Sequence, residues 1–334
     1  MKKLNSKSIY LFIFKNGVLL ALLALWIVMA FASPHFLTMQ NFLNLMLQIT
    51  TPAILGVGMT LVIMTGGIDL SVGSVVAMSG ALLAVLYKHF VQFEYSSAFV
   101  AVLLVSVLPL LTAMLGGTAV GTLNGYLVSR WGLPPFIMTF GMQLMCRGAA
   151  YLITNSQSIS MYSPAIRFLG DTKIGGIVPL PIIIALLMVA GFTVVLKYTS
   201  FGRYVLAFGS NKEALSLSGV NARKVEHLCY IINGVICGFM AIITVGRFNV
   251  LSAVTGDGYE MDAIAAVIVG GTSINGGSGT ITGTLIGALF IGTIRNSLNL
   301  LNIDASTQPL IIGCIMVIAV LFDMINKRKL AEQA

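Results

Sequence analysis

The stretch GMTLVIMTGGIDLSVGSVVAMSGA, residues 58–81, places one aspartate and several glycines between two long apolar runs. A charged carboxylate at the centre of a membrane-spanning helix is costly and is expected to face protein or water. The glycines at 66, 67 and 73 allow the chain to turn at a sharp angle. We therefore expect two helices joined by a tight break. Asp69 is either the cap of the second helix or a group with a role in gating or cargo passage.

The composition places most of the chain in lipid. Of the 334 residues, 57% are hydrophobic and only 9% are charged, and the mean hydropathy is +0.96. A soluble globular domain carries about 25% charged residues. This number of charges is too small to cover the exterior of a soluble protein of this size. The sequence therefore predicts an integral membrane protein.

The net charge of +8 does not indicate a nucleic-acid partner, because the basic residues are spread over short hydrophilic breaks rather than clustered. The sequence contains no phosphate-binding loop, no dinucleotide fingerprint and no catalytic triad. Its three histidines are scattered, so no metal site is predicted. These absences argue against an enzyme, and no catalytic residue and no bound cofactor are expected.

Apolar runs of about 20 residues predict an all-α, polytopic bundle of about ten spans in a single domain, 1–334. The predicted spans lie near 17–33, 43–65, 71–88, 97–128, 134–153, 179–197, 227–246, 260–271, 280–295 and 308–325.

Most of the 19 basic residues fall on one side if the chain begins in the cytoplasm. This orientation gives a cytoplasmic head at 1–16, a long cytoplasmic loop at 197–226 and a cytoplasmic tail at 326–334. An alternative is that the first apolar run, which ends in AFA at 30–32, is a cleaved signal peptide.

Small residues are placed as in a tightly packed membrane bundle. Two glycine trios recur at a spacing of four, Gly117, Gly121 and Gly125 and then Gly279, Gly283 and Gly287, so each trio lies along one helix stripe where another backbone can approach. The four cysteines are expected to be small buried packing residues. GGIDLSVGS and GGTSINGGSG (270–279) each separate two spans, a pattern that either points to a transport pathway or arises by chance.

The cytoplasmic loop, TSFGRYVLAFGSNKEALSLSGVNARKV (199–225), is much longer than a connection between adjacent spans requires. The residues at 209–211 are predicted to turn the chain and cap a helix of about two turns over 212–218, which Gly219 ends. Such a surface helix would suit a soluble partner, although a solvated positive loop is the simpler alternative.

Residues 201–225 resemble the coupling loop of ribose-type permease subunits of bacterial ATP-binding-cassette sugar importers. The segment quoted above and GDGYEMDAIAAVIVGGTSINGGSGTITGTLIGA (256–288) are similar to two further stretches of this branched-chain amino acid/ribose permease family, and RNSLNLLNI (295–303) extends the likeness. Ser210 and Lys212 stand where the family more often has a glycine and a small residue.

The resemblance implies a pore formed by two permease chains in the bacterial plasma membrane. Two ATPase subunits would dock below it and use ATP and magnesium, and an extracytoplasmic sugar-binding protein would deliver cargo. The ATPase-coupling residues would be Gly202, Arg203, Lys212, Glu213, Ala214 and Gly219, with Glu213 as the main charged contact.

Polar residues within or beside the spans are candidates for the translocation pathway or its gate. They are Asp69, Gln48, Asn124, Gln143, Asn233 and Asn296. Each of them can instead satisfy a neighbouring backbone group. Arg167, Lys173 and Asp257, on outer loops, are candidates for contact with the binding protein.

Two other classes of function remain alternatives at this stage. One is an ion-coupled secondary transporter of a small polar solute, which would usually hold a carboxylate inside its pathway. The other is a membrane scaffold or receptor. The sequence does not identify the sugar, or distinguish a homodimer from a heterodimer of permeases.

Overall fold

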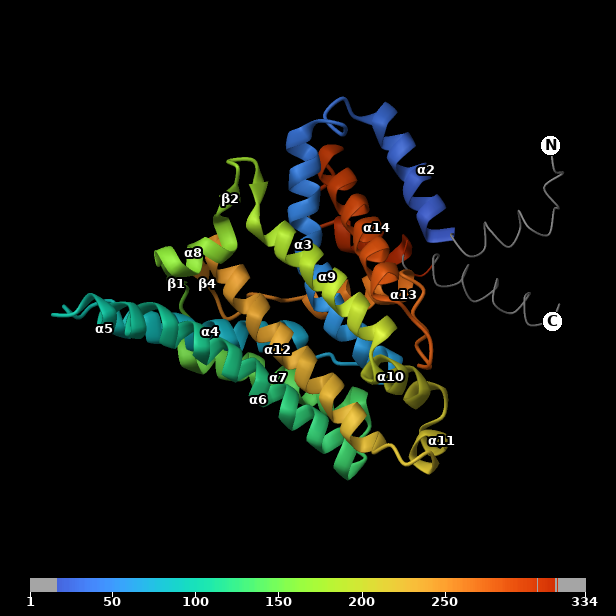
Figure 1. Ribbon diagram of the computed structural model, residues 1–334. Coiled ribbons are helices and arrows are strands. Elements are labelled where there is room, and N and C mark those ends of the chain that lie inside the picture. Colours follow the sequence, from blue (N-terminus) through green and yellow to red (C-terminus); the bar gives the residue numbers. More distant parts are fainter. Residues whose placement is uncertain (1–16, 305, 316, 318–334) are drawn as a thin grey trace.

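The computed structural model describes residues 17–304, 306–315 and 317, and most of these residues are helical (Figure 1). The helices of the first half are α2 (Gly17–Ala32), α3 (Met39–Met64), α4 (Val72–Phe90), α5 (Ala98–Val102), the π-helix η1 (Leu103–Val107), α6 (Leu108–Trp131) and α7 (Pro135–Thr154). Those of the second half are α8 (Pro164–Asp171), α9 (Leu180–Tyr198), α10 (Ser200–Ser210), α11 (Lys212–Leu217), α12 (Ala222–Phe248), α13 (Tyr259–Val269) and α14 (Ile281–Leu300).

The prediction of a polytopic helical bundle is confirmed, but the number of full-length spans is smaller than expected. Seven helices of the described part are long and apolar enough to cross a membrane. The predicted first span forms α2, of 16 residues, and the predicted eighth forms α13, of only 11 residues. At about 1.5 Å per residue, α13 is roughly half as long as a bilayer core is thick. The predicted tenth span is helical over 308–315, and half of it lies outside the described residues.

The overlong fourth span is one continuous helix. α5, η1 and α6 together run over Ala98–Trp131, 34 residues, and the helix carries a π-helical segment near its start. Its α5 end extends beyond the neighbouring helices in Figure 1. Only 11% of its most apolar stretch of 18 residues is buried by protein, so that stretch is largely open on the surface of the chain.

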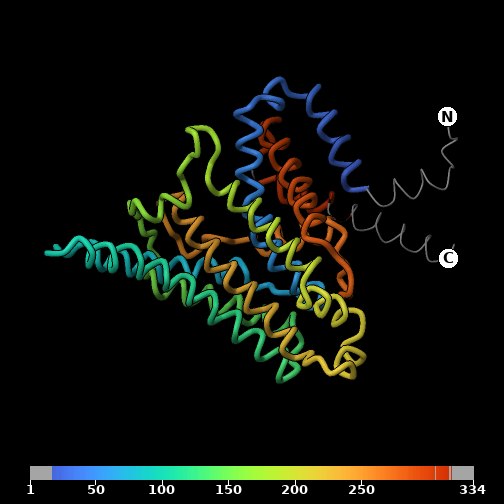
Figure 2. The backbone as a smooth tube through the Cα atoms, viewed as in Figure 1, coloured from blue at the N-terminus to red at the C-terminus, as the bar shows by residue number. Residues whose placement is uncertain are grey.

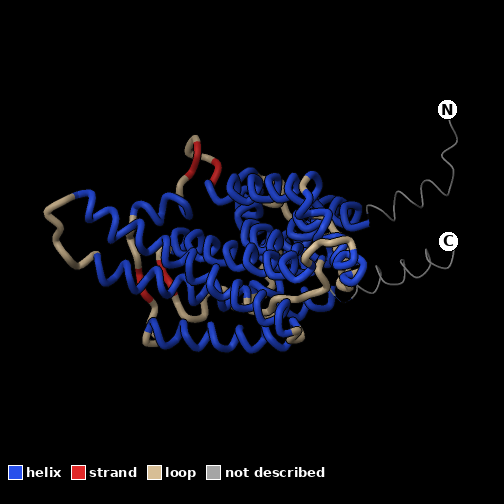
Figure 3. The backbone as a smooth tube through the Cα atoms, turned by 60° about the horizontal axis from the view of Figure 1, so that its bottom comes forward, coloured by secondary structure: helices blue, strands red, loops and turns tan. Residues whose placement is uncertain are grey.

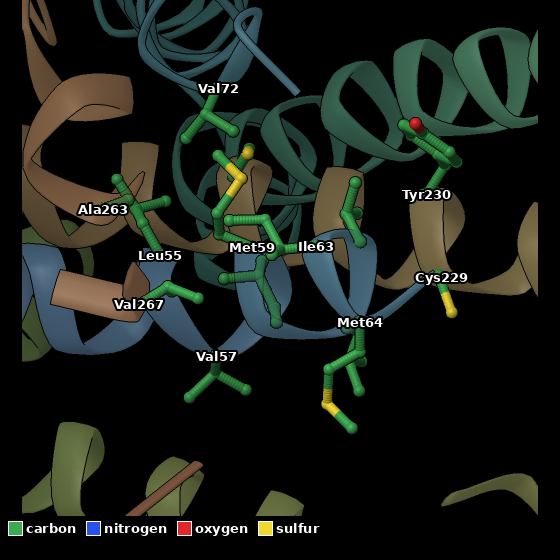
Figure 4. Close-up of a cluster of buried hydrophobic side chains, with 14 of the residues drawn as sticks. Leu55, Val57, Met59, Ile63, Met64, Val72, Cys229, Tyr230, Ala263 and Val267 are labelled. Carbon is green, nitrogen blue, oxygen red and sulfur yellow. The ribbon is translucent and has the colours of Figure 1, made fainter. Parts of the chain in front are cut away.

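α3 is the central helix of the bundle. Every residue from Ile49 to Met64 is buried, on all sides of the helix. α9, α12, α13 and α14 pack around it. Figure 4 shows side chains such as Met59 on α3 lying near Val72 and near Ala263 of α13. A helix that is hydrophobic all round is expected in this position.

α12 joins α3 to a second group formed by α4, α6 and α7 (Figure 2). The predicted close approach at the first glycine stripe is confirmed, because side chains at Gly117, Gly121 and Gly125 would overlap α12. The prediction of a second stripe on one helix is wrong for Gly279, which precedes α14. Gly283 and Gly287 do lie on α14, and they pack closely against the backbone of Gly270 and Ala266. These contacts explain the glycines at these positions by backbone packing.

Short strands lie at one end of α9 and α12. β1 (Ile159–Ser160) pairs with β4 (Val250–Leu251), and β2 (Lys173–Ile174) pairs with β3 (Val178–Pro179), as shown in red in Figure 3. β3 leads directly into α9, and β4 follows α12. The opposite ends of these two long helices are joined by α10 and α11, so the strands and the α10–α11 segment lie at opposite ends of the bundle.

The prediction of buried cysteines holds for three of the four. Cys146, Cys229 and Cys237 are buried, whereas Cys314 is exposed, so the prediction is wrong for Cys314.

Candidate translocation and coupling sites

The segment after α9 folds into two short helices. The predicted helix over 212–218 is observed as α11, and the side chain of Asn211 accepts a 2.8 Å hydrogen bond from the backbone N–H of Ala214 to cap it. Gly219 follows it with a φ of +84°. The expected turn at residues 209–210 is wrong, because these residues end the additional helix α10. Thr199 caps α10 through its side chain.

The six candidate coupling residues divide by exposure. All but Gly202 are exposed, and so is the neighbouring Leu217, at 89%. Gly202 is buried where α10 turns against the end of α9, since a Cβ there would overlap the Leu196 carbonyl. This arrangement presents a small, partly apolar surface helix on a rigid corner.

Lys212 connects α11 to the membrane bundle. Its Nζ lies 2.9 Å from Oε2 of Glu226 in the first turns of α12, and it also lies 4.8 Å from the centre of the Phe208 ring. The Glu226 side chain is 9% exposed and that of Lys212 is 50% exposed. A buried carboxylate needs a partner, so this ion pair fixes α11 relative to α12.

The two glycine-rich breaks meet each other and α10. The backbone N–H of Gly277 donates a 3.0 Å hydrogen bond to the carbonyl of Met64, the last residue of α3. Gly209 of α10 lies against both groups, because a Cβ on Gly209 would overlap the Met64 carbonyl and the Gly277 amide. The similar breaks at 65–74 and 270–279 are therefore parts of one junction, which we call the glycine junction.

Asp69 is 3% exposed and forms a hydrogen-bonded network inside the bundle. Its Oδ1 accepts bonds from the backbone N–H of Ser71 at 2.9 Å and from the Ser71 hydroxyl at 2.6 Å. Its Oδ2 accepts a 2.9 Å bond from the amide of Asn233 on α12. The Asn124 amide on α6 donates to the Ser71 hydroxyl at 3.0 Å. The structure thus brings together three of the six pathway candidates.

The prediction that Asp69 itself caps the helix is wrong in detail. Ser71 is the N-cap of α4 and makes no side-chain cap bond, and Asp69 holds Ser71 in place instead. Within the described part of the chain, Asn124 Oδ1, Asn233 Oδ1 and Tyr230 Oη are buried without a hydrogen-bond partner. The network therefore ties α4, α6 and α12 together and retains spare polar capacity.

Gln143 lies in a second polar contact. Its amide donates a 3.2 Å hydrogen bond to Glu260, which is 3% exposed in the first turn of α13. Arg147, one turn further along α7, donates to the carbonyls of Ala253 and Thr255 at 2.6 and 2.9 Å. α7 thereby holds the segment that leads into the short helix α13.

The last two pathway candidates lie elsewhere. Asn296 on α14 exchanges two amide hydrogen bonds, of 2.9 and 3.1 Å, with Asn41 on α3. Gln48 on α3 lines a cavity between α3, α12, α13 and α14. The six candidates therefore do not form one continuous site.

The three outer-loop candidates are exposed near the strands. Arg167 on α8 forms a 2.8 Å ion pair with Asp171, four residues further along. Lys173 lies on β2, and Asp257 is 83% exposed, with its carboxylate 3.9 Å from the Arg147 guanidinium. Their charges are thus available to solvent at the end of the bundle opposite α11.

Sequence reasoning missed several of these partners. Glu226 was not singled out, because fourteen residues and a turn separate it from Lys212. Ser71 and Asn41 belong to no motif that marks them as hydrogen-bond partners, so the sequence did not predict their contacts with Asp69 and Asn296. In the described ranges no three His, Cys, Asp or Glu side chains are grouped as a metal site would require.

A bundle of glycine-packed helices, two glycine-interrupted breaks and a rigid surface helix together define a multi-pass membrane permease. Residues 41–320 match the family described as the permease component of the branched-chain amino acid transport system. The chain belongs to this family, and it is a non-enzymatic permease subunit of a bacterial ATP-binding-cassette transporter.

Curated relatives cover nearly the whole chain. The ribose import permease protein of Escherichia coli strain K12 is 38% identical over 314 residues, which is 93% of each chain. The ribose import permease protein of Bacillus subtilis strain 168 is 36% identical over 314 residues, 92% of each chain. The D-allose transport system permease protein of Escherichia coli strain K12 is 33% identical over 294 residues, covering 86% of this chain and 85% of the relative. No solved structure matches this chain.

Proposed function

We propose that this chain forms the translocation pathway for a monosaccharide that an extracytoplasmic binding protein delivers. Support for a sugar cargo comes from relatives named for ribose, L-arabinose, D-allose and fructose. Ribose is the cargo to test first, because the ribose permeases are 35–38% identical to this chain, whereas the L-arabinose, D-allose and fructose permeases are 32–34% identical. The family assignment sets aside the ion-coupled secondary transporter and the scaffold as alternatives.

The chain spans the membrane about ten times, with both termini in the cytoplasm. In this arrangement α2 and the helix that starts at residue 308 complete the seven long spans, and α13 is a half-length segment. The α10–α11 end is cytoplasmic and the strand end faces outward. Arg167, Lys173 and Asp257 meet the binding protein at that outer end.

α11 is the docking helix for a separate ATPase subunit, which binds and hydrolyses ATP with magnesium. Glu213, Ala214 and Arg203 form the contact, while Lys212, Gly202 and Gly219 hold the helix in position. A second permease subunit, identical or related, completes the pore. The observation that carries this proposal is α11 itself, capped at Asn211 and fixed to α12 through the Lys212–Glu226 ion pair.

Reconstitution tests the proposal directly. The permease, its ATPase and its binding protein are placed in proteoliposomes, and uptake of labelled D-ribose and D-allose is measured with and without ATP. We expect uptake to require ATP and the binding protein and to resist ionophores. Uptake that proceeds without ATP, or that stops when the ion gradient is removed, would contradict the proposed function.

A further inference from the structure

A cavity of about 150 Å³ lies at the start of the short helix α13. It is formed by α3, the last turn of α12, the first turn of α13 and the second half of α14. Its lining residues are Gln48, Thr51, Pro52, Arg247, Tyr259, Asp262, Ile291, Gly292 and Arg295. Residues of four helices thus line one small, partly open space.

The polar groups of this cavity include both donors and acceptors. The Arg295 guanidinium lies 2.9 Å from Asp262 Oδ1, and the Arg247 guanidinium donates a 3.2 Å bond to the Leu47 carbonyl. A guanidinium carries five N–H groups, so each arginine has donors beyond these bonds. Gln48 Oε1 is a buried acceptor that no described residue satisfies.

The mixture of groups indicates the chemistry of a ligand. A sugar hydroxyl donates one hydrogen bond and accepts two, so it suits a lining that holds both donors and acceptors. The Gln48 oxygen is buried in this structure, so the Gln48 side chain must turn toward the cavity to accept a bond from the sugar. Pro52 and Ile291 add an apolar wall that suits the C–H face of a sugar ring. Apolar pockets with a few placed polar groups are typical of small-molecule sites.

The place of the cavity in the fold fits a transport pathway. Binding sites of transporters often lie where a helix is interrupted inside the membrane. α13 is such a helix, because it has only 11 residues and follows Gly258 with a φ of +80°. Its first turn faces two ways, with Asp262 at the cavity and Glu260 against Gln143 of α7.

We propose that this cavity is a low-affinity subsite for the sugar in transit, with Gln48, Arg247 and the Asp262–Arg295 pair as the groups that hold its hydroxyls. This inference rests on the proposed function. The proposed ligand is a neutral polyhydroxylated molecule, because the lining places acceptors, the Asp262 carboxylate and the Gln48 side chain, beside the guanidinium donors. Few groups contact it, so the sugar is released again.

Cysteine protection tests whether the sugar enters the cavity. In a Cys314→Ser background, Gln48→Cys is treated with a small membrane-impermeant thiol reagent, with and without millimolar D-ribose. The three remaining native cysteines are buried. We expect D-ribose to slow labelling at residue 48 several-fold and to leave the control Asn299→Cys, an exposed position on α14, unchanged. Absence of labelling, or labelling that D-ribose does not slow, would overturn the subsite, and protection by ribose 5-phosphate alone would overturn a neutral ligand.

Transport stoichiometry provides the second measurement. Gln48→Met keeps the length of the side chain and removes its polar group, so we expect about fivefold less sugar moved per ATP hydrolysed, the equivalent of one hydrogen bond of about 1 kcal/mol. The matched control is Gln157→Met on an exposed outer loop, which should leave the ratio unchanged. If the wild-type complex imports D-ribose and Gln48→Met keeps its ratio, the subsite fails while the proposed function stands. If the wild-type complex imports no sugar, the proposed function itself fails.

Discussion

Replacing Asp69 separates the two roles that its position allows, support of the fold and control of cargo passage. In Asp69→Ala, three donors lose their acceptor: the Ser71 N–H, the Ser71 hydroxyl and the Asn233 amide. Hydrogen bonds between membrane helices contribute about 0.6 kcal/mol on average and up to about 1.7 kcal/mol. We therefore expect Asp69→Ala to reduce the free energy of unfolding by about 2 to 5 kcal/mol.

Asp69→Asn should cost far less. The new side chain keeps one oxygen to accept both bonds from Ser71, and its amide replaces the oxygen that faced Asn233. Asn233 Oδ1 has no partner among the described residues, so rotation of its amide group can restore the lost bond. The expected loss is at most one hydrogen bond, about 1 kcal/mol.

The stability of each variant is measured by SDS titration of the purified protein in mild detergent. Unfolding is followed by a thiol-reactive dye that reports exposure of Cys146, Cys229 and Cys237. Asp171→Ala, which removes an exposed ion pair, serves as a control that should change stability by less than about 1 kcal/mol. Equal midpoints for Asp69→Ala and wild type, or equal losses for the two Asp69 variants, would refute the reasoning. Normal folding of Asp69→Asn with complete loss of uptake would assign Asp69 to gating rather than to support.

Three further changes test the α10–α11 segment. Gly209→Ala should reduce the free energy of unfolding by about 1 to 3 kcal/mol, because its Cβ would overlap backbone atoms. Thermal unfolding measures this loss, and the control Gly148→Ala, at a position that faces open space, should show none. Lys212→Met leaves the Glu226 carboxylate unpaired and should destabilise the protein by about 1 to 3 kcal/mol. Adding Glu226→Gln to Lys212→Met should recover most of that stability. If the double variant is even less stable, the ion pair does not connect α11 to α12 as described. Glu213→Arg should leave membrane insertion and stability unchanged but reduce co-purification of the ATPase at least about tenfold, or about 1.4 kcal/mol; undiminished recovery of the ATPase would argue against α11 as the docking helix.

Local sequence signals predicted much of the architecture. Long apolar runs identified the helices, and the glycine spacing on α6 identified its contact with α12, because both follow directly from helix geometry. The same is true of α11, since Asn211 and Gly219 are a cap and a stop whose effect extends over only one turn. The likeness of residues 201–225 to a family of coupling loops then gave the class of transporter, which the family comparison confirms.

Contacts between distant segments were not predictable in this way. The sequence places Asp69 beside Ser71, but it gives no sign that Asn233, 164 residues away, donates to the same carboxylate. The sequence also gives no sign that Gly209 and Gly277 both contact the Met64 carbonyl. α10 was missed because Gly209 and Ser210 favour a turn locally, whereas packing against the glycine junction stabilises a helix there.

The glycine junction has a consequence for how this protein evolves and transmits force. Met64, Gly209 and Gly277 meet through main-chain atoms, which every amino acid shares. Any residue larger than glycine at 209 would push α10 away from the end of α3 and from Gly277, whereas substitutions on the other faces of α10 do not alter this contact. Contacts of this kind have no rotatable side chain to absorb displacement. A force applied to α10 would therefore reach the end of α3 and the segment that leads into α14 at the same time.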